Sequence, residues 1–443
     1  MQTHKISFLT AVFMIVANTI GTGVFTSLGF QLEAFSNPLV ILALWILGGM
    51  TALCGAFLYS ELESRFPGSG GETHFAQVLY GPGMGFLAGW VSIIAGFAIP
   101  IAATAYACSR YLLPTGSPEN SYLFFAAFLV VAVSILNFFS TRLIGRVQNF
   151  FVILKICMIL GLSFLLFSKT NSGDKLVWTV DKDFWHSVLS APFAISLVFV
   201  GFAYSGWNAV VYIAKEVDNK VTALPRAMFY GTAITVVLYL LFNMSLMVST
   251  PLHLMSGKLE VASASALFHM QDKGLILMKA LLSLSLFTCL TSLIWAGSHV
   301  VMKCADNYPL FHFALFRRND CEVRSTILLS SVALVILATM DFQKMILSTG
   351  FLLVFFSLVC AFGLVWHRSF KTMPEKKVEY LASFYPWSAI FFILINLWVA
   401  VFLLKTEKSS VNASLFILGL GLLVYRVQYR LTQTTKTRIF SET

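Results

Sequence analysis

The residues best suited to binding a small ligand lie in two glycine-containing stretches, NTIGTGVF (Asn18 to Phe25) and FAYSGWN (Phe202 to Asn208). Each interrupts an apolar run long enough to cross a bilayer, and glycine weakens a helix where the backbone has no water to bond. A turn unwound after Ile20 would direct the amide groups of residues 22–24 toward one point, at the positive end of the following helix. A carboxylate can bind there without a basic side chain.

The second break supplies the opposite polarity. Unwinding near Phe202 and Tyr204 would leave backbone carbonyls unpaired, and unpaired carbonyls suit a primary ammonium group. Together the two stretches predict a receptor for a zwitterion. The alternative is that Gly21 and Gly23 only allow close helix packing, as small residues often do in membranes.

The composition indicates what kind of molecule positions these stretches. Of 443 residues, 58% are hydrophobic and only 11% are charged, which excludes an ordinary soluble domain. The basic residues are dispersed among short loops, so they favour contact with lipid headgroups and not with nucleic acid. The seven cysteines show no CxxC or Cys/His ligand spacing, so no metal or cofactor is expected.

Apolar runs of spanning length predict an all-α integral membrane protein with about twelve transmembrane helices. These runs lie at roughly 7–33, 38–63, 84–113, 121–139, 146–168, 188–214, 226–250, 275–302, 325–340, 343–366, 385–404 and 411–428.

The order of the spans predicts an internal repeat. Residues 1–168 would hold helices 1–5, and residues 188–366 would hold helices 6–10. Each set begins with a broken helix, and the two sets start from opposite sides of the membrane. This is a 5+5 inverted repeat, with two extra helices in residues 385–428. The protein is expected in the cell (plasma or inner) membrane. Basic residues are more frequent in the loops on one side, so both termini are expected to face the cytoplasm.

Charged residues near the spans suggest further roles. Lys155 lies deep inside an apolar run, where a charge is costly and usually functional, although snorkelling to the interface is the alternative. Glu61 and Arg65 are four residues apart near the end of the second span, so an ion pair across one helical turn is expected.

The motifs resemble those of one transporter family. NTIGTGVF, LYSELESRFPGSGGE (Leu58 to Glu72) and FAYSGWNAVVYIAKEVDNKVTALPRAM (Phe202 to Met228) resemble the amino acid–polyamine–organocation (APC) superfamily. Within it the chain is most similar to the L-type amino acid transporters and their bacterial amino acid permease relatives.

The resemblance implies a role for each matching residue. Backbone amides of Thr22 and Gly23 would bind the substrate carboxylate, and carbonyls of Thr19, Phe202 and Ser205 would bind the ammonium. The implied substrate site comprises Thr19, Gly21, Thr22, Gly23, Phe202, Tyr204, Ser205, Gly206 and Asn208. The implied gating residues are Phe202, Glu61, Glu216 and Arg226.

The resemblance also gives Lys155 a coupling role. Its ammonium would take the place of the sodium ion of sodium-coupled relatives and tie helix 5 to the break in helix 1. Transport is therefore expected to be sodium-independent, although Thr291 and Ser292 offer hydroxyl ligands that leave sodium open.

The expected function is secondary active transport of neutral L-amino acids by alternating access, through exchange or proton coupling. The alternatives are a cationic amino acid or polyamine carrier and a non-transporting amino acid sensor. An enzyme is not expected, because the spans hold no HExxH, GxSxG or paired aspartates. The loop from Pro114 to Asn120 has no cysteine for a disulfide link, so no obligatory accessory subunit is expected.

Overall fold

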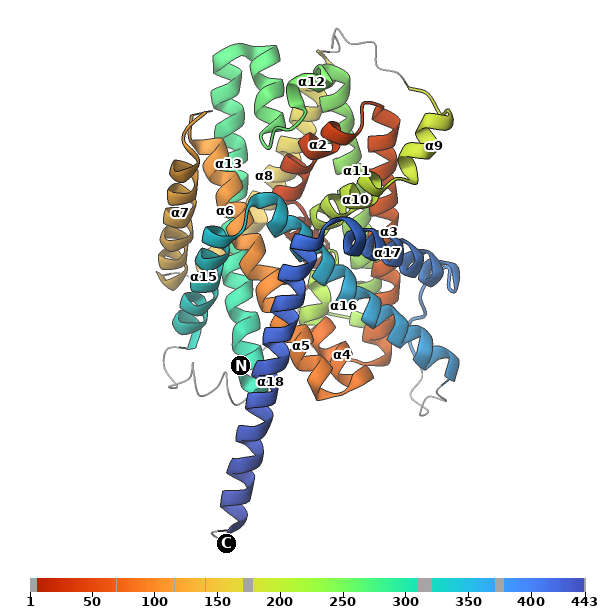
Figure 1. Ribbon diagram of the computed structural model, residues 1–443, viewed down its shortest axis with the longest axis vertical. Coiled ribbons are helices and arrows are strands. Elements are labelled where there is room, and N and C mark those ends of the chain that lie inside the picture. The colour runs from red at the N-terminus through yellow and green to blue at the C-terminus, as the bar shows by residue number, and fades with distance from the viewer. Residues whose placement is uncertain are drawn as a thin grey trace.

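The computed structural model describes residues 6–68, 70–114, 116–139, 141–169, 178–308, 321–370 and 378–441. In these ranges the chain forms a bundle of helices (Figure 1), and its one β contact is an isolated parallel bridge between Ile6 and Val217. The predicted all-α class is confirmed.

The long helices make the chain a multi-pass membrane protein. Across the described ranges, 10 helices are long and apolar enough to span a bilayer, or 12 if two bent helix pairs each count as one span. This agrees with the predicted number of spans. The single helices are α3 (Pro38–Arg65), α7 (Glu119–Phe139), α8 (Thr141–Phe167), α11 (Lys220–Ser249), α13 (Val261–Asn307), α15 (Cys321–Thr339), α16 (Phe342–Phe370), α17 (Trp387–Thr406) and α18 (Lys408–Ser441), and one further span joins α5 (Pro82–Val91), the π-helical η1 (Ser92–Ala98) and α6 (Ile99–Leu112).

The first span is broken in the middle. It consists of α1 (Phe8–Thr19) and α2 (Thr22–Ala34), which meet at a bend of 41°. The Ser7 side chain caps the start of α1 by accepting a hydrogen bond from the Thr10 amide. The break lies where glycine was expected to weaken the helix.

The sixth span is also broken, but its second half is not an α-helix. After α10 (Ala191–Ala203) the chain turns through residues 204–208 and continues as the 3₁₀ helix η2 (Ala209–Glu216). Ahead of α10 lies the short helix α9 (Lys182–Val188), bent from it by 58°. The predicted single run over 188–214 therefore contains one α-helix, a turn and a tighter helix.

Two other short helices lie between spans. α4 (Glu72–Tyr80) begins after Gly71 and ends at Gly81, whose φ values of 54° and 96° favour glycine. α12 (Leu252–Met255) precedes α13. Neither has a long apolar run, so the hydropathy pattern did not reveal them.

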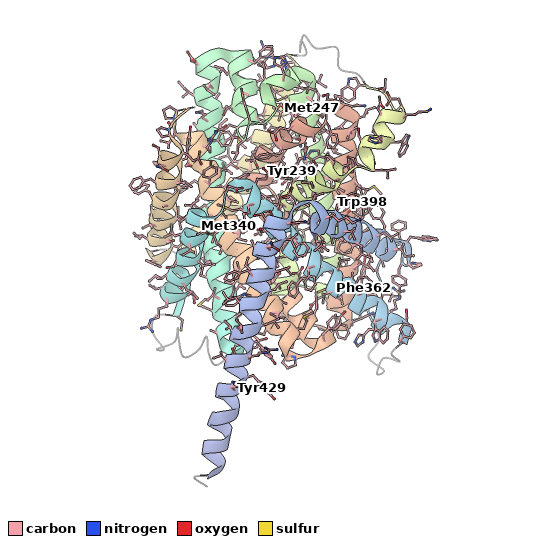
Figure 2. All side chains as sticks on the ribbon, in the orientation of Figure 1. Tyr239, Met247, Met340, Phe362, Trp398 and Tyr429 are labelled. Atoms are coloured by element: carbon pink, nitrogen blue, oxygen red, sulfur yellow. The ribbon has the colours of Figure 1, made fainter. Side chains whose placement is uncertain are left out.

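Close packing places α10 between α3 and α16. A Cβ added to Gly48 of α3, or to Gly350 of α16, would lie within 2.4 Å of a Val200 or Val198 side-chain carbon of α10. Small residues thus allow these helices to touch, as in other membrane proteins. Near this centre Tyr239 of α11 is fully buried (Figure 2). Phe124 and Phe164 are more than three-quarters exposed, as expected of apolar side chains on the outside of a membrane protein.

Candidate functional site

The first break presents free amide groups. Ile20 and Gly21 leave the helical conformation, and α2 starts at Thr22 with no side chain capping it. The first amides of a helix have no partner within it and carry the positive end of the helix dipole. The break therefore leaves the Thr22 and Gly23 amides without a partner inside α2, and their binding of a carboxylate stays a prediction.

The second break differs from expectation in one respect. The carbonyl of Phe202 was expected to be unpaired, but it accepts hydrogen bonds from the Ser205 amide at 3.0 Å and from Ser205 Oγ at 2.6 Å. That expectation is wrong because the chain closes into a turn instead of simply fraying. The Tyr204 hydroxyl points away into α3, where it donates to the carbonyl of Trp45 at 3.1 Å.

Two glycines bring the breaks into contact. A Cβ added to Gly23 would lie 2.4 Å from the Cα of Ala203, and one added to Gly206 would lie 2.8 Å from the carbonyl of Asn18. Gly206 also has a φ of 103°, which side chains rarely adopt. The close-packing role of glycine is therefore compatible with the proposed binding role, because the contact holds the buried, unpaired amides beside the second turn.

Tyr239, which was not predicted, links the two breaks. Its hydroxyl lies 2.6 Å from the carbonyl oxygen of Thr19 and 3.1 Å from that of Ala203. Its ring packs against Trp45 and Tyr204, with centroids 5.5 and 5.1 Å away. The Thr19 carbonyl, expected to bind an ammonium, thus already accepts one bond and retains its second lone pair.

Lys155 lies beside the first break. Its side chain is buried, and its Nζ donates to the carbonyl of Ile20 at 3.3 Å. A Cβ added to Gly21 would lie 3.4 Å from Sγ of Cys289 on α13, so α13 flanks the same point. Lys155 therefore ties α8 to the break and does not snorkel to the interface. The Thr291 and Ser292 hydroxyls donate to carbonyls of their own helix.

The predicted ion pair between Glu61 and Arg65 of α3 is confirmed and extends to a second helix. The buried Glu61 carboxylate lies 2.6 Å from Arg65 and 2.9 Å from Arg368 of α16, and it accepts the Ala382 amide at 2.8 Å. The guanidinium of Arg368 also stacks on Tyr385. This group joins α3 to α16, which is a structural role in this conformation.

The other residues expected to act in gating are Glu216, Arg226 and Phe202. Glu216 ends η2, Arg226 lies on α11 and Phe202 lies in the second break. The Glu216 carbonyl accepts the Ile6 amide at 2.7 Å, and the Ile6 carbonyl accepts the Asp218 amide at 2.9 Å. The Glu216 side chain and Arg226 are exposed, whereas Phe202 is buried. The start of α1 is thus bonded to the end of η2.

Asn208 does not contact the first break through its side chain. Its Nδ2 instead donates at 3.3 Å to Oε1 of Glu72, a buried carboxyl that sequence reasoning did not single out. The only signal was the position of Glu72 at the end of the GSGGE segment.

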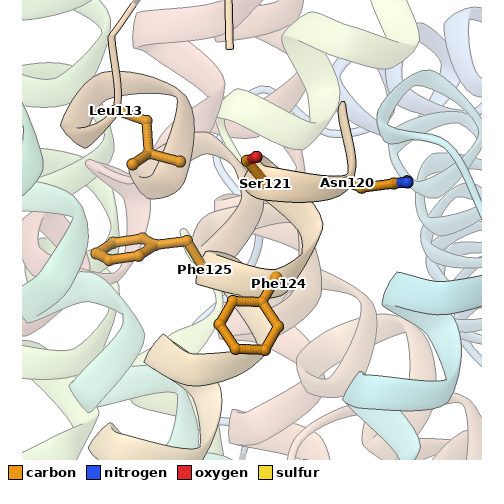
Figure 3. Close-up of a pocket in the computed structure, with 5 residues that line it drawn as sticks. All are labelled: Leu113, Asn120, Ser121, Phe124 and Phe125. Atoms are coloured by element: carbon orange, nitrogen blue, oxygen red, sulfur yellow. The ribbon is translucent and has the colours of Figure 1, made fainter. Parts of the chain in front are cut away.

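The opposite end of the bundle is held by different contacts. The Gly257 amide donates to the carbonyl of Gly29 at 3.0 Å, and Arg110 pairs with Glu260 at 2.6 Å. A surface groove nearby is lined by Leu113, Asn120, Ser121, Phe124 and Phe125 (Figure 3), and it contains no residue of either break.

Comparisons with known proteins agree with this architecture. The family model described as "Amino acid permease" matches residues 6–425. The chain is 26% identical over 435 residues to the serine/threonine exchanger SteT of Bacillus subtilis, covering 95% of this chain and 96% of that protein. It is 25% identical over 435 residues to the human large neutral amino acids transporter small subunit 2, covering 95% of this chain and 79% of that protein. Over 253 residues, 54% of this chain and 50% of the relative, it is 31% identical to the human b(0,+)-type amino acid transporter 1.

Proposed function

The chain belongs to the amino acid permease family and is an amino acid transporter, not an enzyme, and we propose that it exchanges neutral L-amino acids by alternating access. The observation that carries this proposal is the meeting of two broken helices, one of which offers free amides at Thr22 and Gly23. Free backbone amides recognise the carboxylate that all amino acids share. The Thr19 carbonyl, which retains a lone pair, would accept a hydrogen bond from the ammonium.

The charge of the site favours neutral substrates. Neither Asn18 to Phe25 nor Phe202 to Asn208 contains an acidic residue. A cationic side chain or a polyamine needs a carboxylate to replace its lost hydration. The serine/threonine exchanger and the large neutral amino acids transporter are named for neutral substrates, which supports the same choice.

Alternating access is supported by separate contacts at the two ends. Opening the end near Ile6 would break its bonds to Glu216 and Asp218, while opening the other end would break those at Gly257 and Glu260. Each set of contacts can break while the other set stays intact. We propose that residues 1–168 and 188–366 form the two inverted repeats that rock against each other, with residues 385–428 accessory.

Lys155 supports sodium-independent transport. Its ammonium is a fixed cation at the first break, held by the Ile20 carbonyl. A bound sodium ion nearby would be repelled by that charge. We propose that Lys155 replaces the ion and stabilises the break through the cycle.

The proposed setting is the plasma or inner membrane, with both termini in the cytoplasm, so the end near Ile6 faces inward. The human relative is named a small subunit. In this chain the loop from Pro114 to Asn120 has no cysteine. We therefore propose that it works without a disulfide-linked partner.

Substrate selectivity tests the proposal. Proteoliposomes loaded with radiolabelled serine are exposed to external serine, leucine, arginine or putrescine, and efflux is followed. We expect efflux with the neutral amino acids at least about tenfold faster than with arginine or putrescine, a difference of about 1.4 kcal/mol. Equal or faster efflux with arginine would identify a cationic carrier, and specific binding of serine without efflux would identify a sensor.

A further inference from the structure

A buried carboxyl joins three elements at the end of the bundle near Ile6. Glu72 is the first residue of α4, and only 4% of it is exposed. Its Oε1 accepts a hydrogen bond from the Tyr59 hydroxyl of α3 at 2.7 Å and one from Asn208 Nδ2 at 3.3 Å. Glu72 therefore connects α3, α4 and the turn of the second break.

The surroundings of Glu72 fasten α4 to η2. The Gly70 amide donates to the carbonyl of Tyr212 at 3.2 Å, and a Cβ added to Gly71 would lie 2.9 Å from the Tyr212 ring. The Tyr59 ring packs against Trp207 with centroids 4.8 Å apart. Because η2 is bonded to the residues just before α1, separation at Glu72 would loosen this whole end.

The charges around Glu72 do not neutralise an ionised carboxylate. In the part of the chain that the structure describes, no basic side chain forms an ion pair with it. Phenols and thiols are neutral near pH 7, and burial lowers the pKa of His74, so that this imidazole is neutral there too. The titratable groups that face Glu72 or lie beside it are Tyr59 on α3, Tyr212 and Lys215 on η2, Cys360 on α16 and His74 on α4.

Burial raises the pKa of Glu72 from 4.5 to about 7, although the hydrogen bonds from Tyr59 and Asn208 act in the opposite direction. This conformation therefore binds the proton more tightly than a solvated carboxyl would. A protonated Glu72 keeps both bonds, since Oε1 still accepts them while Oε2 carries the proton. The described contacts thus suit the neutral acid.

We propose that Glu72 is a proton-binding site that keeps the end near Ile6 closed when protonated and favours its opening when ionised. On opening, water reaches the carboxyl, its O–H bond breaks and the proton passes to water on that side. Reclosing takes a proton back from the same solution, so the pH there sets the transport rate. The inference rests on the proposed function, and it is separate from the role of Lys155.

The pH profile of exchange tests this inference. We measure exchange of labelled serine in proteoliposomes with equal pH on both sides, between about pH 5.5 and 8.5. The wild-type rate should rise with pH around a midpoint near 7, as the carboxyl ionises. Glu72→Gln cannot ionise, so its rate should stay near the low wild-type rate at acid pH throughout. Glu72→Asp should restore a rising profile.

A second variant changes the midpoint without removing the carboxyl. Tyr59→Phe deletes a hydrogen bond to the carboxylate and so should move the midpoint upward by roughly half a unit or more, an effect that loss of packing alone would not produce. His74→Gln and Glu322→Gln, the latter at the start of α15, serve as controls and should leave the profile unchanged.

The outcomes separate the two proposals. No exchange by the wild-type protein at any pH would refute the proposed function. Wild-type exchange whose pH profile survives Glu72→Gln, or disappears in His74→Gln, would overturn the assignment to Glu72 alone. If Glu72→Gln does not fold, the midpoint in Tyr59→Phe decides, and an unchanged midpoint rejects the proposal.

Discussion

An added methyl group at Gly23 tests whether the two breaks must touch for the protein to work. In Gly23→Ala the new Cβ would lie 2.4 Å from the Cα of Ala203 and 2.6 Å from its Cβ. Both atoms belong to Ala203 of α10, which has no flexible side chain that could move aside. The two helices must separate instead.

The size of the effect follows from these distances. Ordinary contacts of a Cβ begin at 3.4 Å, so α2 and α10 must move apart by about 1 Å. Overpacking of this kind typically costs about 1–3 kcal/mol, equivalent to roughly 5- to 150-fold in an equilibrium. Because the strain falls beside the free amides of α2, we expect exchange to drop by at least about tenfold.

Gly201→Ala is the matched control. Gly201 lies on α10 two residues before Ala203, and a Cβ there would have nothing within 4 Å. Alanine should be neutral or stabilise the helix by up to about 1 kcal/mol. Initial rates of serine exchange, normalised to the folded protein recovered by size exclusion, compare the two variants. Wild-type exchange by Gly23→Ala, or an equal loss in both variants, would refute the reasoning.

Four further substitutions test three other contacts. Lys155→Met leaves the Ile20 carbonyl without its donor, at a cost of about 1–3 kcal/mol, so exchange should fall roughly tenfold or more; initial rates within twofold of wild type would contradict its proposed role. Tyr239→Phe removes the hydroxyl between the breaks and should lower the melting temperature and the exchange rate together; loss of neither would show that the link is dispensable. Arg110→Gln and Glu260→Gln should each destabilise the detergent-solubilised protein, with a coupling of about 1 kcal/mol in the double variant; additive effects would mean that the pair contributes nothing.

The breaks could be predicted because their cause is local. Glycine at membrane depth weakens a helix wherever it occurs, so Gly21 and Gly206 mark the unwound turns in the sequence itself. Lys155 was predictable for a similar reason, because a lysine so deep in an apolar run must find a partner in the protein.

The links between elements could not be predicted, since their partners are far apart in the chain. Tyr239 and Thr19 are 220 residues apart, and Glu260 and Arg110 are 150 apart. Nothing in the residues around a tyrosine in an apolar helix indicates which distant carbonyl it will meet. Likewise the 3₁₀ form of η2 depends on its packing against neighbouring elements and not on its own apolar pattern.

The central claim is that two broken helices bind a neutral amino acid and exchange it across the membrane. The most direct measurement is uptake of labelled serine into proteoliposomes that contain either unlabelled serine or no amino acid, with sodium absent in both. The account predicts rapid uptake only when internal serine is present, and its loss in Gly23→Ala but not in Gly201→Ala. Equal uptake into empty vesicles, or uptake that requires sodium, would contradict the exchange mechanism proposed.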